Sequence, residues 1–181
     1  MLSHPFTPVY DEHAEILILG SFPSVKSREN EFYYGHPQNR FWKVLAAVFE
    51  DEVPASIDEK IQFLHQHHIA LWDVIASCEI TGSADASITN ATPNDIANLV
   101  TKAPIRKICC NGTKAWELFQ KYINLKKDTL LETKADFKLT AADNSQIEIV
   151  KLPSTSPANA AWTLEKLISV WKKELFTGDN K

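Results

Sequence analysis

Ile16-Leu17-Ile18-Leu19-Gly20-Ser21-Phe22-Pro23-Ser24 is an apolar run that passes directly into a small, polar segment. Four consecutive apolar residues predict a short buried strand, and the glycine, serines and proline predict a loop at its end. Three more apolar runs have a similar character, at residues 69–75, 105–110 and 147–152. We therefore expect four short strands.

Amphipathic helix patterns alternate with these strands, with apolar residues at helical spacing. The patterns begin at Phe41, Ile57, Ala115 and Leu164. Thr92 and Pro93 have the form of a further helix start, with the threonine as N-cap and the proline at the first helical position. The alternation predicts an α/β fold, a three-layer α/β/α arrangement with a central, mostly parallel four-stranded sheet.

The composition is that of a compact globular protein. A length of 181 residues and a hydrophobic content of 44% suit a single domain with a substantial core. We expect that domain over residues 1–176 and a disordered tail over residues 177–181. Apolar stretches long enough to span a bilayer and the features of a signal peptide are both missing from the sequence. This predicts a cytoplasmic protein.

Metal and redox chemistry are not expected. The cysteines are Cys78, Cys109 and Cys110, an odd number without metal-ligand spacing, and we interpret them as buried thiols. The histidines at positions 65, 67 and 68 lack a carboxylate or cysteine partner at ligand spacing. We therefore predict no metal site and no cofactor.

The net charge of −4 argues against an extended nucleic-acid interface, because lysine and arginine supply most of the affinity for phosphates. Four cations nevertheless surround the first loop: Lys26, Arg28, Arg40 and Lys43. A small footprint on a nucleic acid needs only such a local patch. The alternative is that these cations are ordinary solvated charges.

Residues 33–42, with the sequence Tyr-Tyr-Gly-His-Pro-Gln-Asn-Arg-Phe-Trp, place aromatic rings, an amide and a cation together just before a helix. This combination suits a nucleic-acid base. A second polar loop, residues 154–157, follows the last predicted strand. Ligands of open α/β sheets bind beyond the carboxyl ends of the strands, so we expect these loops to meet at one site with residues 20–24.

These segments resemble motifs of the uracil-DNA glycosylase superfamily, and most closely of its hypoxanthine-DNA glycosylase branch. Residues 20–24 are similar to the first motif of the superfamily, and residues 154–159 to the second. Residues 36–43 are similar to the His-Pro-x-Asn-Arg-Phe-Trp-Lys run of the mismatch-specific members. The resemblance covers nearly the whole chain and implies a uracil-DNA glycosylase-like fold.

The chain departs from most branches at Phe22, where they place a catalytic aspartate or asparagine. The hypoxanthine branch is similar in lacking that residue, and the resemblance implies that Asn39 is catalytic instead. Its amide has donors and an acceptor that suit it to hold a water against the anomeric carbon and to interact with developing positive charge. The alternative is that Asn39 caps the helix that begins just after it. We treat the two roles as exclusive.

The resemblance also implies a set of base-binding residues: Ser21, Phe22, Tyr34, Asp73 and Ser154. Tyr34 aligns with the aromatic residue that stacks on the flipped base, whereas Tyr33 fits core packing equally well. The backbone N–H groups of Ser21 and Phe22 are expected to face the base. Ser154 stands where other branches stabilise the departing base.

Asp73 lies where related enzymes place an asparagine that contacts the uracil edge. An ionised carboxylate accepts hydrogen bonds but cannot donate them. It suits the N1–H of hypoxanthine, whereas the neighbouring O6 needs a donor from elsewhere. The alternative is that Asp73 is a cap or turn residue at the end of its strand.

Contacts to the DNA backbone are assigned to four polar residues: Ser24, Arg40, Ser156 and Asn159. Ser156 matches the phosphate-binding serine of the second motif. The alternative is that residues 154–159 form a simple serine- and proline-rich turn.

The sequence thus predicts a monofunctional DNA glycosylase that excises deaminated bases, most of all hypoxanthine, with uracil and xanthine as further substrates. A mismatch-specific uracil or thymine glycosylase is the close alternative, and a non-catalytic nucleic-acid-binding module is the distant one. No lysine near the motifs is placed as a Schiff-base nucleophile. We expect a monomer whose partner is DNA containing deaminated bases and which does not bind membranes.

Overall fold

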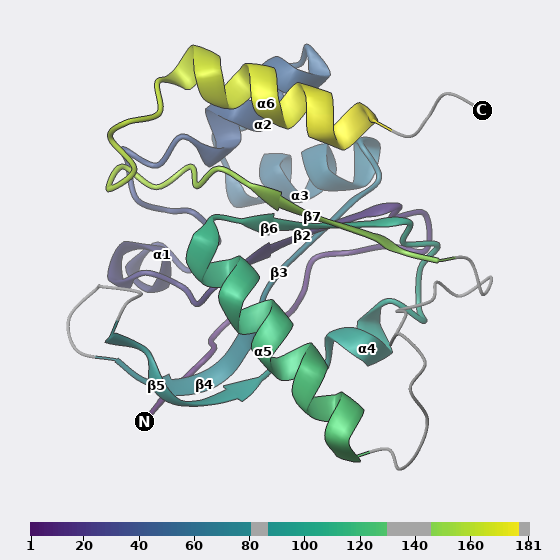
Figure 1. Cartoon of the computed structure of the whole chain (residues 1–181). Coiled ribbons are helices and arrows are strands. Elements are labelled where there is room, and N and C mark those ends of the chain that lie inside the picture. Colours follow the sequence, from purple (N-terminus) through teal and green to yellow (C-terminus); the bar gives the residue numbers. More distant parts are fainter. Residues whose placement is uncertain (81–86, 130–145, 178–181) are drawn as a thin grey trace.

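The computed structural model describes residues 1–80, 87–129 and 146–177. At its centre is a sheet of four parallel strands in the order β3-β2-β6-β7 (Figure 1). The strands are β2 (Ile16–Gly20), β3 (Ile69–Asp73), β6 (Lys107–Asn111) and β7 (Glu148–Leu152). All four predicted strands and the predicted fold class are therefore confirmed.

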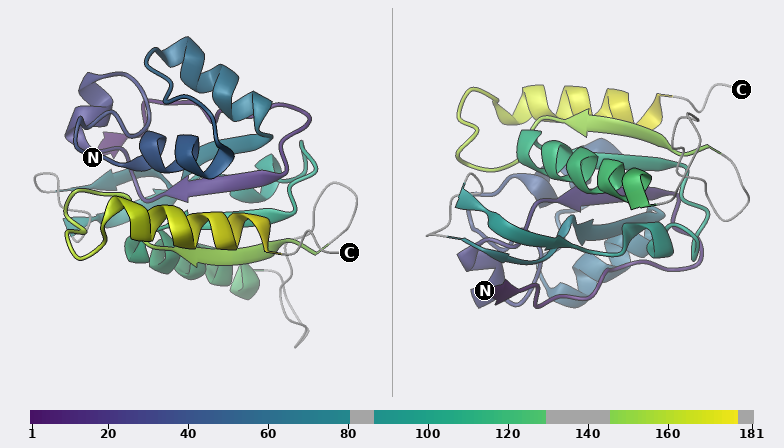
Figure 2. Two further views of the ribbon diagram at one scale, coloured as in Figure 1. Left: turned by 90° about the horizontal axis from the view of Figure 1, so that it is seen from above. Right: turned by 60° about the horizontal axis from the view of Figure 1, so that its bottom comes forward.

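Helices cover both faces of this sheet (Figure 2). On one face lie α2 (Phe41–Phe49), α3 (Ile57–Gln66) and α6 (Leu164–Phe176). On the other lie α4 (Ile96–Leu99) and α5 (Thr113–Thr129). The four amphipathic patterns in the sequence correspond to α2, α3, α5 and α6, because each helix buries one apolar stripe against the sheet.

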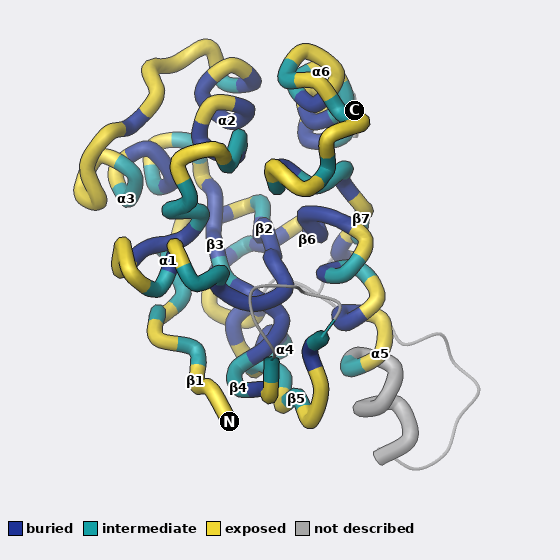
Figure 3. Tube along the Cα trace, turned by 90° about the vertical axis from the view of Figure 1, so that its left-hand side faces the viewer, coloured by how far each residue is buried: buried dark blue, intermediate teal, exposed yellow. Residues whose placement is uncertain are grey.

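The two faces of the sheet contribute to two apolar cores, since successive side chains of a strand point to opposite faces. On β2, Leu17 and Leu19 belong to one core, and Ile18 belongs to the other. Figure 3 shows the resulting buried centre as dark blue strand segments flanked by partly exposed helices. Because β2 is buried on both faces of the sheet, it fixes the position at which the following loop begins.

A second sheet, antiparallel and in the order β1-β4-β5, was not expected from the sequence. Its strands are β1 (Leu2–Ser3), β4 (Ile75–Glu79) and β5 (Thr89–Pro93). The expected strand over residues 69–75 is wrong at its end, because β3 stops at Asp73 and Ile75 opens β4. The backbone N–H of Val74 donates to the carbonyl of Gly20, 2.9 Å away, where the chain leaves the parallel sheet. One apolar run thus serves two sheets.

The expected helix start at Thr92 and Pro93 is also wrong. Both residues lie in β5, an edge strand, where a missing proline N–H costs no ladder hydrogen bond. The helix α4 begins after Asp95, whose side chain accepts the N–H of Asn98. A short helix that was not predicted, α1 (Val25–Glu29), follows the loop after β2 and is capped by Ser24.

Of the predicted tail, residues 178–181 lie outside the described residues, and α6 ends at Phe176. The single domain over residues 1–176 stays a prediction. None of the described helices is long and apolar enough to cross a membrane.

Candidate functional site

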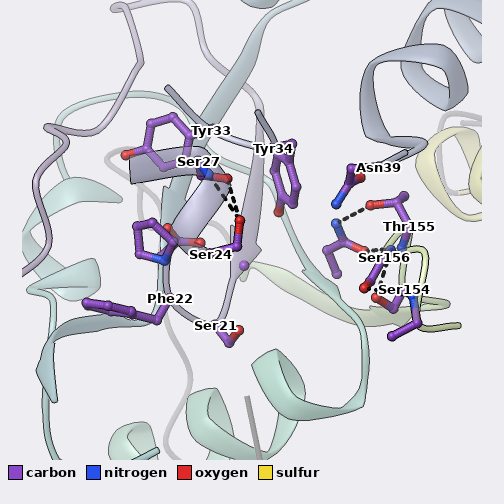
Figure 4. Close-up of a pocket in the computed structure, with 15 residues that line it drawn as sticks. Ser21, Phe22, Ser24, Ser27, Tyr33, Tyr34, Asn39, Ser154, Thr155 and Ser156 are labelled. Carbon is purple, nitrogen blue, oxygen red and sulfur yellow. Dashed lines mark hydrogen bonds between the residues drawn. The ribbon is translucent and has the colours of Figure 1, made fainter. Parts of the chain in front are cut away.

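A cavity of about 360 Å³ opens at the carboxyl ends of the parallel strands (Figure 4). The loops that follow β2 and β7 meet there with the last residues of β3 and β6, as expected for an open α/β sheet. The lining residues are Gly20, Ser21, Phe22, Pro23, Ser24, Ser27, Tyr33, Tyr34, Asn39, Asp73, Asn111, Ser154, Thr155, Ser156 and Ala158. Of the ten predicted site residues, all but Arg40 and Asn159 lie in this lining.

Gly20 ends β2 at the floor of the cavity, and only a hydrogen atom fits in place of a side chain. A Cβ atom at this position would lie 2.2 Å from Oδ1 of Asp73 and 3.0 Å from the hydroxyl oxygen of Tyr34. The glycine therefore allows the carboxylate and the phenol to approach the same point of the backbone.

Tyr34 has a backbone φ of 54°, in the left-handed region that non-glycine residues rarely adopt. Its ring stacks on Phe41, with centroids 3.8 Å apart and planes 16° from parallel. Phe41 is the first residue of α2 and is fully buried, so it supports the ring from behind. The strained backbone and the stacked partner hold a flat aromatic surface at the cavity.

Tyr33, in contrast, packs in the core. It is 2% exposed, and its hydroxyl donates to the carbonyl of Thr7 at 2.9 Å. Burial raises the pKa of the Tyr33 hydroxyl, and the charge of Asp73 adds to this effect. Of the two roles considered for Tyr33, core packing agrees with the structure.

Asn39 reaches the cavity from the start of α2. Its Oδ1 accepts the backbone N–H of Phe41 at 3.0 Å, so the amide caps the helix although Arg40 occupies the N-cap position itself. A carbonyl oxygen has two lone pairs, and the amide also carries two N–H donors. The capping bond therefore leaves one acceptor site and both donors, and Asn39 is among the residues that line the pocket in Figure 4. Asn39 therefore caps the helix and lines the cavity at the same time, and its catalytic role stays a prediction.

Asp73, the last residue of β3, is 4% exposed and lines the cavity. Its Oδ2 lies 2.8 Å from Nε2 of His4, a residue that the sequence analysis did not select. Its Oδ1 lies beside Gly20 and the Tyr34 hydroxyl. The carboxylate thus contacts a side chain from the N-terminal segment, which differs from the cap or turn role considered as the alternative.

A pair of hydrogen bonds joins β6 to the loop after β7. Nδ2 of Asn111 donates to the hydroxyl oxygen of Thr155, and the backbone N–H of Thr155 donates to Oδ1 of Asn111, both at 3.0 Å. Thr155 is fully buried. Sequence reasoning missed Asn111, and its only signal was a polar residue before a glycine at a strand end.

The loop itself contains several local hydrogen bonds. The hydroxyl oxygen of Ser154 accepts the N–H of Ser156 at 3.2 Å, and that of Ser156 accepts the N–H of Ala158 at 3.3 Å. Nδ2 of Asn159 donates to the carbonyl of Ser154 at 2.9 Å. These are the bonds of a serine-rich turn, but each hydroxyl keeps its own proton to donate.

Arg40 holds this loop from the α2 side. Its guanidinium donates to the carbonyls of Ser156 at 2.6 Å, Asn159 at 3.1 Å and Thr155 at 3.3 Å, and also to that of Trp162. The backbone N–H of Arg40 donates to the Thr155 carbonyl as well. The loop carbonyls therefore use most of the N–H donors of the Arg40 guanidinium. The contact of Arg40 with a DNA phosphate stays a prediction.

The cation patch around the first loop is smaller than the sequence suggested. Lys26 forms an ion pair with Glu29 at 2.6 Å, and Arg40 is occupied as described. Arg28 lies 5.9 Å from the centroid of the Phe22 ring.

The three cysteines are buried and free, which confirms their interpretation as structural thiols. Burial raises the pKa of Cys110 to about 12 and also raises that of Cys109. A thiol with so high a pKa is protonated at neutral pH and is a poor nucleophile.

Comparison with known proteins finds a match to the family described as the uracil DNA glycosylase superfamily, over residues 7–175. A protein of Methanosarcina acetivorans named hypoxanthine DNA glycosylase is 40% identical over 119 residues, which are 65% of this chain and 75% of the relative. A protein of the same name from Methanosarcina barkeri is 36% identical with the same coverage. A solution NMR structure of a candidate uracil DNA glycosylase from Methanosarcina acetivorans matches with a TM-score of 0.71 and 30% identity, covering 95% of this chain and 98% of that one.

Proposed function

This chain belongs to the uracil DNA glycosylase superfamily, and from that premise we propose that it is a monofunctional DNA glycosylase that excises hypoxanthine from DNA. The observation that carries the proposal is the placement of Tyr34, Asn39 and Asp73 around one cavity. These residues supply an aromatic surface, an amide and a carboxylate edge, each with a separate task in glycosidic hydrolysis. A volume of about 360 Å³ lies in the range of small-ligand pockets.

The damaged nucleotide has to leave the duplex to enter this cavity. An inosine pairs less well than the base it replaces, which lowers the cost of flipping and adds selectivity. Once extruded, the base stacks on Tyr34, whose ring is held in place by Phe41. Stacking of this kind contributes about 1 to 3 kcal/mol per base and does not depend on base identity.

Identity is determined at the edge of the base. Oδ1 of Asp73 faces the cavity floor and accepts the N1–H of hypoxanthine. The neighbouring O6 needs a donor, for which the backbone N–H groups of Ser21 and Phe22 are suitably close to the cavity. A carboxylate repels the two carbonyl oxygens that flank N3–H in uracil, so uracil is the poorer substrate.

Hydrolysis breaks the bond between C1′ of the sugar and N9 of the base. The electron pair of that bond leaves with hypoxanthine, and positive charge develops on the sugar. Asn39 holds a water at C1′ through its remaining acceptor site, and its amide is oriented by the capping bond to Phe41. The water oxygen adds to C1′ and its proton is released, while the departing base takes up a proton and accepts a hydrogen bond from Ser154.

The DNA backbone is bound beside the cavity by Ser24 and Ser156, and by Asn159 at the next turn of the loop. Arg40 contributes through the position of this loop, because its guanidinium binds the loop carbonyls. No lysine occurs among the described residues that line the cavity, so no covalent imine with the sugar forms and the product is an intact abasic site.

The protein acts in base excision repair as a cytoplasmic monomer and leaves abasic sites for later enzymes. The lining residues come from the ends of β2, β3 and β6, from the loops after β2 and β7, from α1, and from the segment between α1 and α2.

The test uses purified protein and duplex oligonucleotides that carry one inosine, uracil, xanthosine or thymine mismatch. We expect strand cleavage at inosine after alkali but not before it, with slower cleavage at uracil. Cleavage that favours uracil or thymine mismatches over inosine would identify a mismatch-specific enzyme instead. An excess of enzyme that yields no abasic site in any duplex would contradict the proposal.

A further inference from the structure

His4 lies directly behind the carboxylate of Asp73. The two atoms that face each other, Nε2 of His4 and Oδ2 of Asp73, are 2.8 Å apart. Both side chains are almost completely buried, at 3% and 6% exposure. The pair crosses from the N-terminal segment to the end of β3, a separation of 69 residues in the sequence. One carboxylate oxygen is thus bound to an imidazole, and the other remains at the cavity.

The imidazole is held from several sides. The backbone N–H of His4 donates to the carbonyl of Ala76 at 2.7 Å, beside the pairing of β1 with β4. The rings of Phe6 and Phe22 contact the imidazole edge to face, with centroids 5.6 Å and 5.9 Å away. Because Phe22 also lines the cavity, His4 is one residue removed from the bound base.

The second ring nitrogen has a partner in either protonation state. Nδ1 of His4 lies 3.1 Å from the backbone nitrogen of Phe6 and 2.9 Å from its carbonyl oxygen. A neutral ring accepts the N–H of Phe6, and a charged ring donates to the carbonyl. In both cases Nε2 carries a hydrogen and donates it to Asp73, so the carboxylate has a donor whatever the charge of His4.

The other titratable groups of the described residues around this pair are phenols and one arginine. They are Tyr33, whose ring centroid lies 5.9 Å from that of His4, Tyr34 beside Asp73, and Arg28 over Phe22. The Tyr33 hydroxyl donates to Thr7, away from the pair. His4 is therefore the donor that satisfies the buried oxygen of Asp73.

We propose that His4 is a positioning residue that determines base specificity, because its Nε2–H keeps Asp73 an ionised hydrogen-bond acceptor. The inference rests on the proposed function. A carboxyl group at this depth that lost its donor would favour the neutral form. A neutral carboxyl group has one donor and one acceptor, the same pattern as an asparagine amide. Without His4, Asp73 would therefore act as the asparagine that suits uracil.

The experiment compares single-turnover excision of hypoxanthine and of uracil by wild type, His4→Phe and His4→Gln. The phenylalanine keeps the ring contacts and removes the donor, whereas the glutamine keeps an N–H donor without an ionisable ring. We expect His4→Phe to lower the hypoxanthine-to-uracil ratio about tenfold, as for the loss of one hydrogen bond to a charged group. His4→Gln should return the ratio close to that of wild type.

The pH dependence separates this role from a merely structural one. In His4→Phe the ratio should rise again with pH, because Asp73 loses its proton and becomes an acceptor once more. In wild type the ratio should not change with pH, because Nε2 donates in both states of the ring. The wild-type measurement tests the inference even if His4→Phe does not fold.

A double substitution completes the design. Adding His4→Phe to Asp73→Asn should not change the ratio further, because no carboxyl group is left to protonate. Equal loss of both rates in His4→Phe, or the same change of ratio in both backgrounds, would overturn the inference. A wild-type ratio that changes tenfold with pH would do so too. If wild type releases no hypoxanthine, the proposed function fails and the inference with it; an active wild type with an unaltered ratio in His4→Phe refutes the inference alone.

Discussion

The two sides of the cavity are held together in different ways. One side, which we call the base wall, consists of Gly20, Tyr34 and Asp73. Its two side chains are each held by one main contact, which is the stack on Phe41 for Tyr34 and the hydrogen bond to His4 for Asp73. The other side, the braced loop of residues 154–162, is held by many hydrogen bonds to its backbone, including four from one arginine.

This difference indicates how each side responds to change. A single substitution in the base wall changes which groups face the base while the fold persists, because few other contacts depend on it. A single substitution in the braced loop leaves other bonds to hold the backbone, unless it removes Arg40. Specificity should therefore reside in the base wall, and stability and catalytic positioning in the loop and its supports.

Asn39 lines the cavity together with both sides, and its loss should have the largest effect on rate. Asn39→Ala removes the group that positions water, at a cost of about 3 to 4 kcal/mol of barrier, or several hundredfold in single-turnover excision. It also removes the cap on α2, which should lower the free energy of unfolding by about 1 kcal/mol.

Asn39→Asp is the matched control, because it keeps the oxygen that accepts the Phe41 N–H. Its free energy of unfolding in urea should be no lower than that of wild type, so that a change of its rate reports the exchange of the N–H donors for a negative charge and not the loss of the cap. Wild-type excision by a destabilised Asn39→Ala protein would mean that the asparagine is only a cap.

The loss of Arg40 should have the next largest effect. We expect it to lower the stability of the fold and to leave the preference between the two bases unchanged. Arg40→Ala removes four side-chain hydrogen bonds to loop carbonyls, three of which keep a backbone N–H donor, and should lower the free energy of unfolding by about 2 to 3 kcal/mol. Excision of both bases should fall by the same factor, because the one base contact proposed for the braced loop, from Ser154 to the departing base, is available to both bases.

Arg40→Lys distinguishes bracing from a phosphate contact. Lysine keeps the charge but lacks the planar fork that reaches several carbonyls at once. We expect it to resemble alanine in urea unfolding and in rate. Full rescue of DNA affinity and of rate by lysine would show that the charge, and not the fork, is what matters.

Asp73→Asn should change specificity with little loss of stability. The amide donates as well as accepts, so the ratio of uracil to hypoxanthine excision should rise about tenfold. Single-turnover rates on the two duplexes measure this directly. If both rates change by one common factor, Asp73 does not contact the base and the contrast between the two sides of the cavity disappears.

Ser156→Ala should have the smallest effect. The braced loop loses one weak internal bond, to the N–H of Ala158 at 3.3 Å, and keeps the rest, so stability should fall by no more than about 0.5 kcal/mol. Affinity for DNA should fall about threefold if the hydroxyl also binds a phosphate, as one neutral hydrogen bond predicts. Ser156→Thr, which retains the hydroxyl, should bind DNA like wild type in the same titration.

Much of the fold was predictable from local pattern. The four parallel strands appear as apolar runs because both faces are covered, and α2, α3 and α6 appear as amphipathic stripes because each covers one face. The antiparallel sheet was missed because β4 continues the apolar run of β3, and β5 carries the residues of a helix start. Local residues do not show whether the β5 segment pairs with β4 or starts a helix.

The site was predictable only where it coincides with a contiguous motif. Residues 20–24, 33–42 and 154–159 are such motifs, and twelve of their members lie in one cavity lining. The supporting contacts join distant positions, as between Arg40 and Ser156 or between Asn111 and Thr155. A side chain that acts through a partner more than forty residues away has no local sequence signal.

The sequence by itself determined the class of the protein, because strand and helix periodicity and the contiguous motifs depend only on neighbours along the chain. It also determined which chemical groups are present: an amide, a carboxylate and an aromatic ring near strand ends. Only the tertiary structure decided how these groups are used, since the direction of an amide or the partner of a carboxylate depends on contacts across the fold. Asn39 is oriented by the Phe41 N–H, Arg40 is taken by the braced loop, and Asp73 faces the cavity with one oxygen because His4 binds the other.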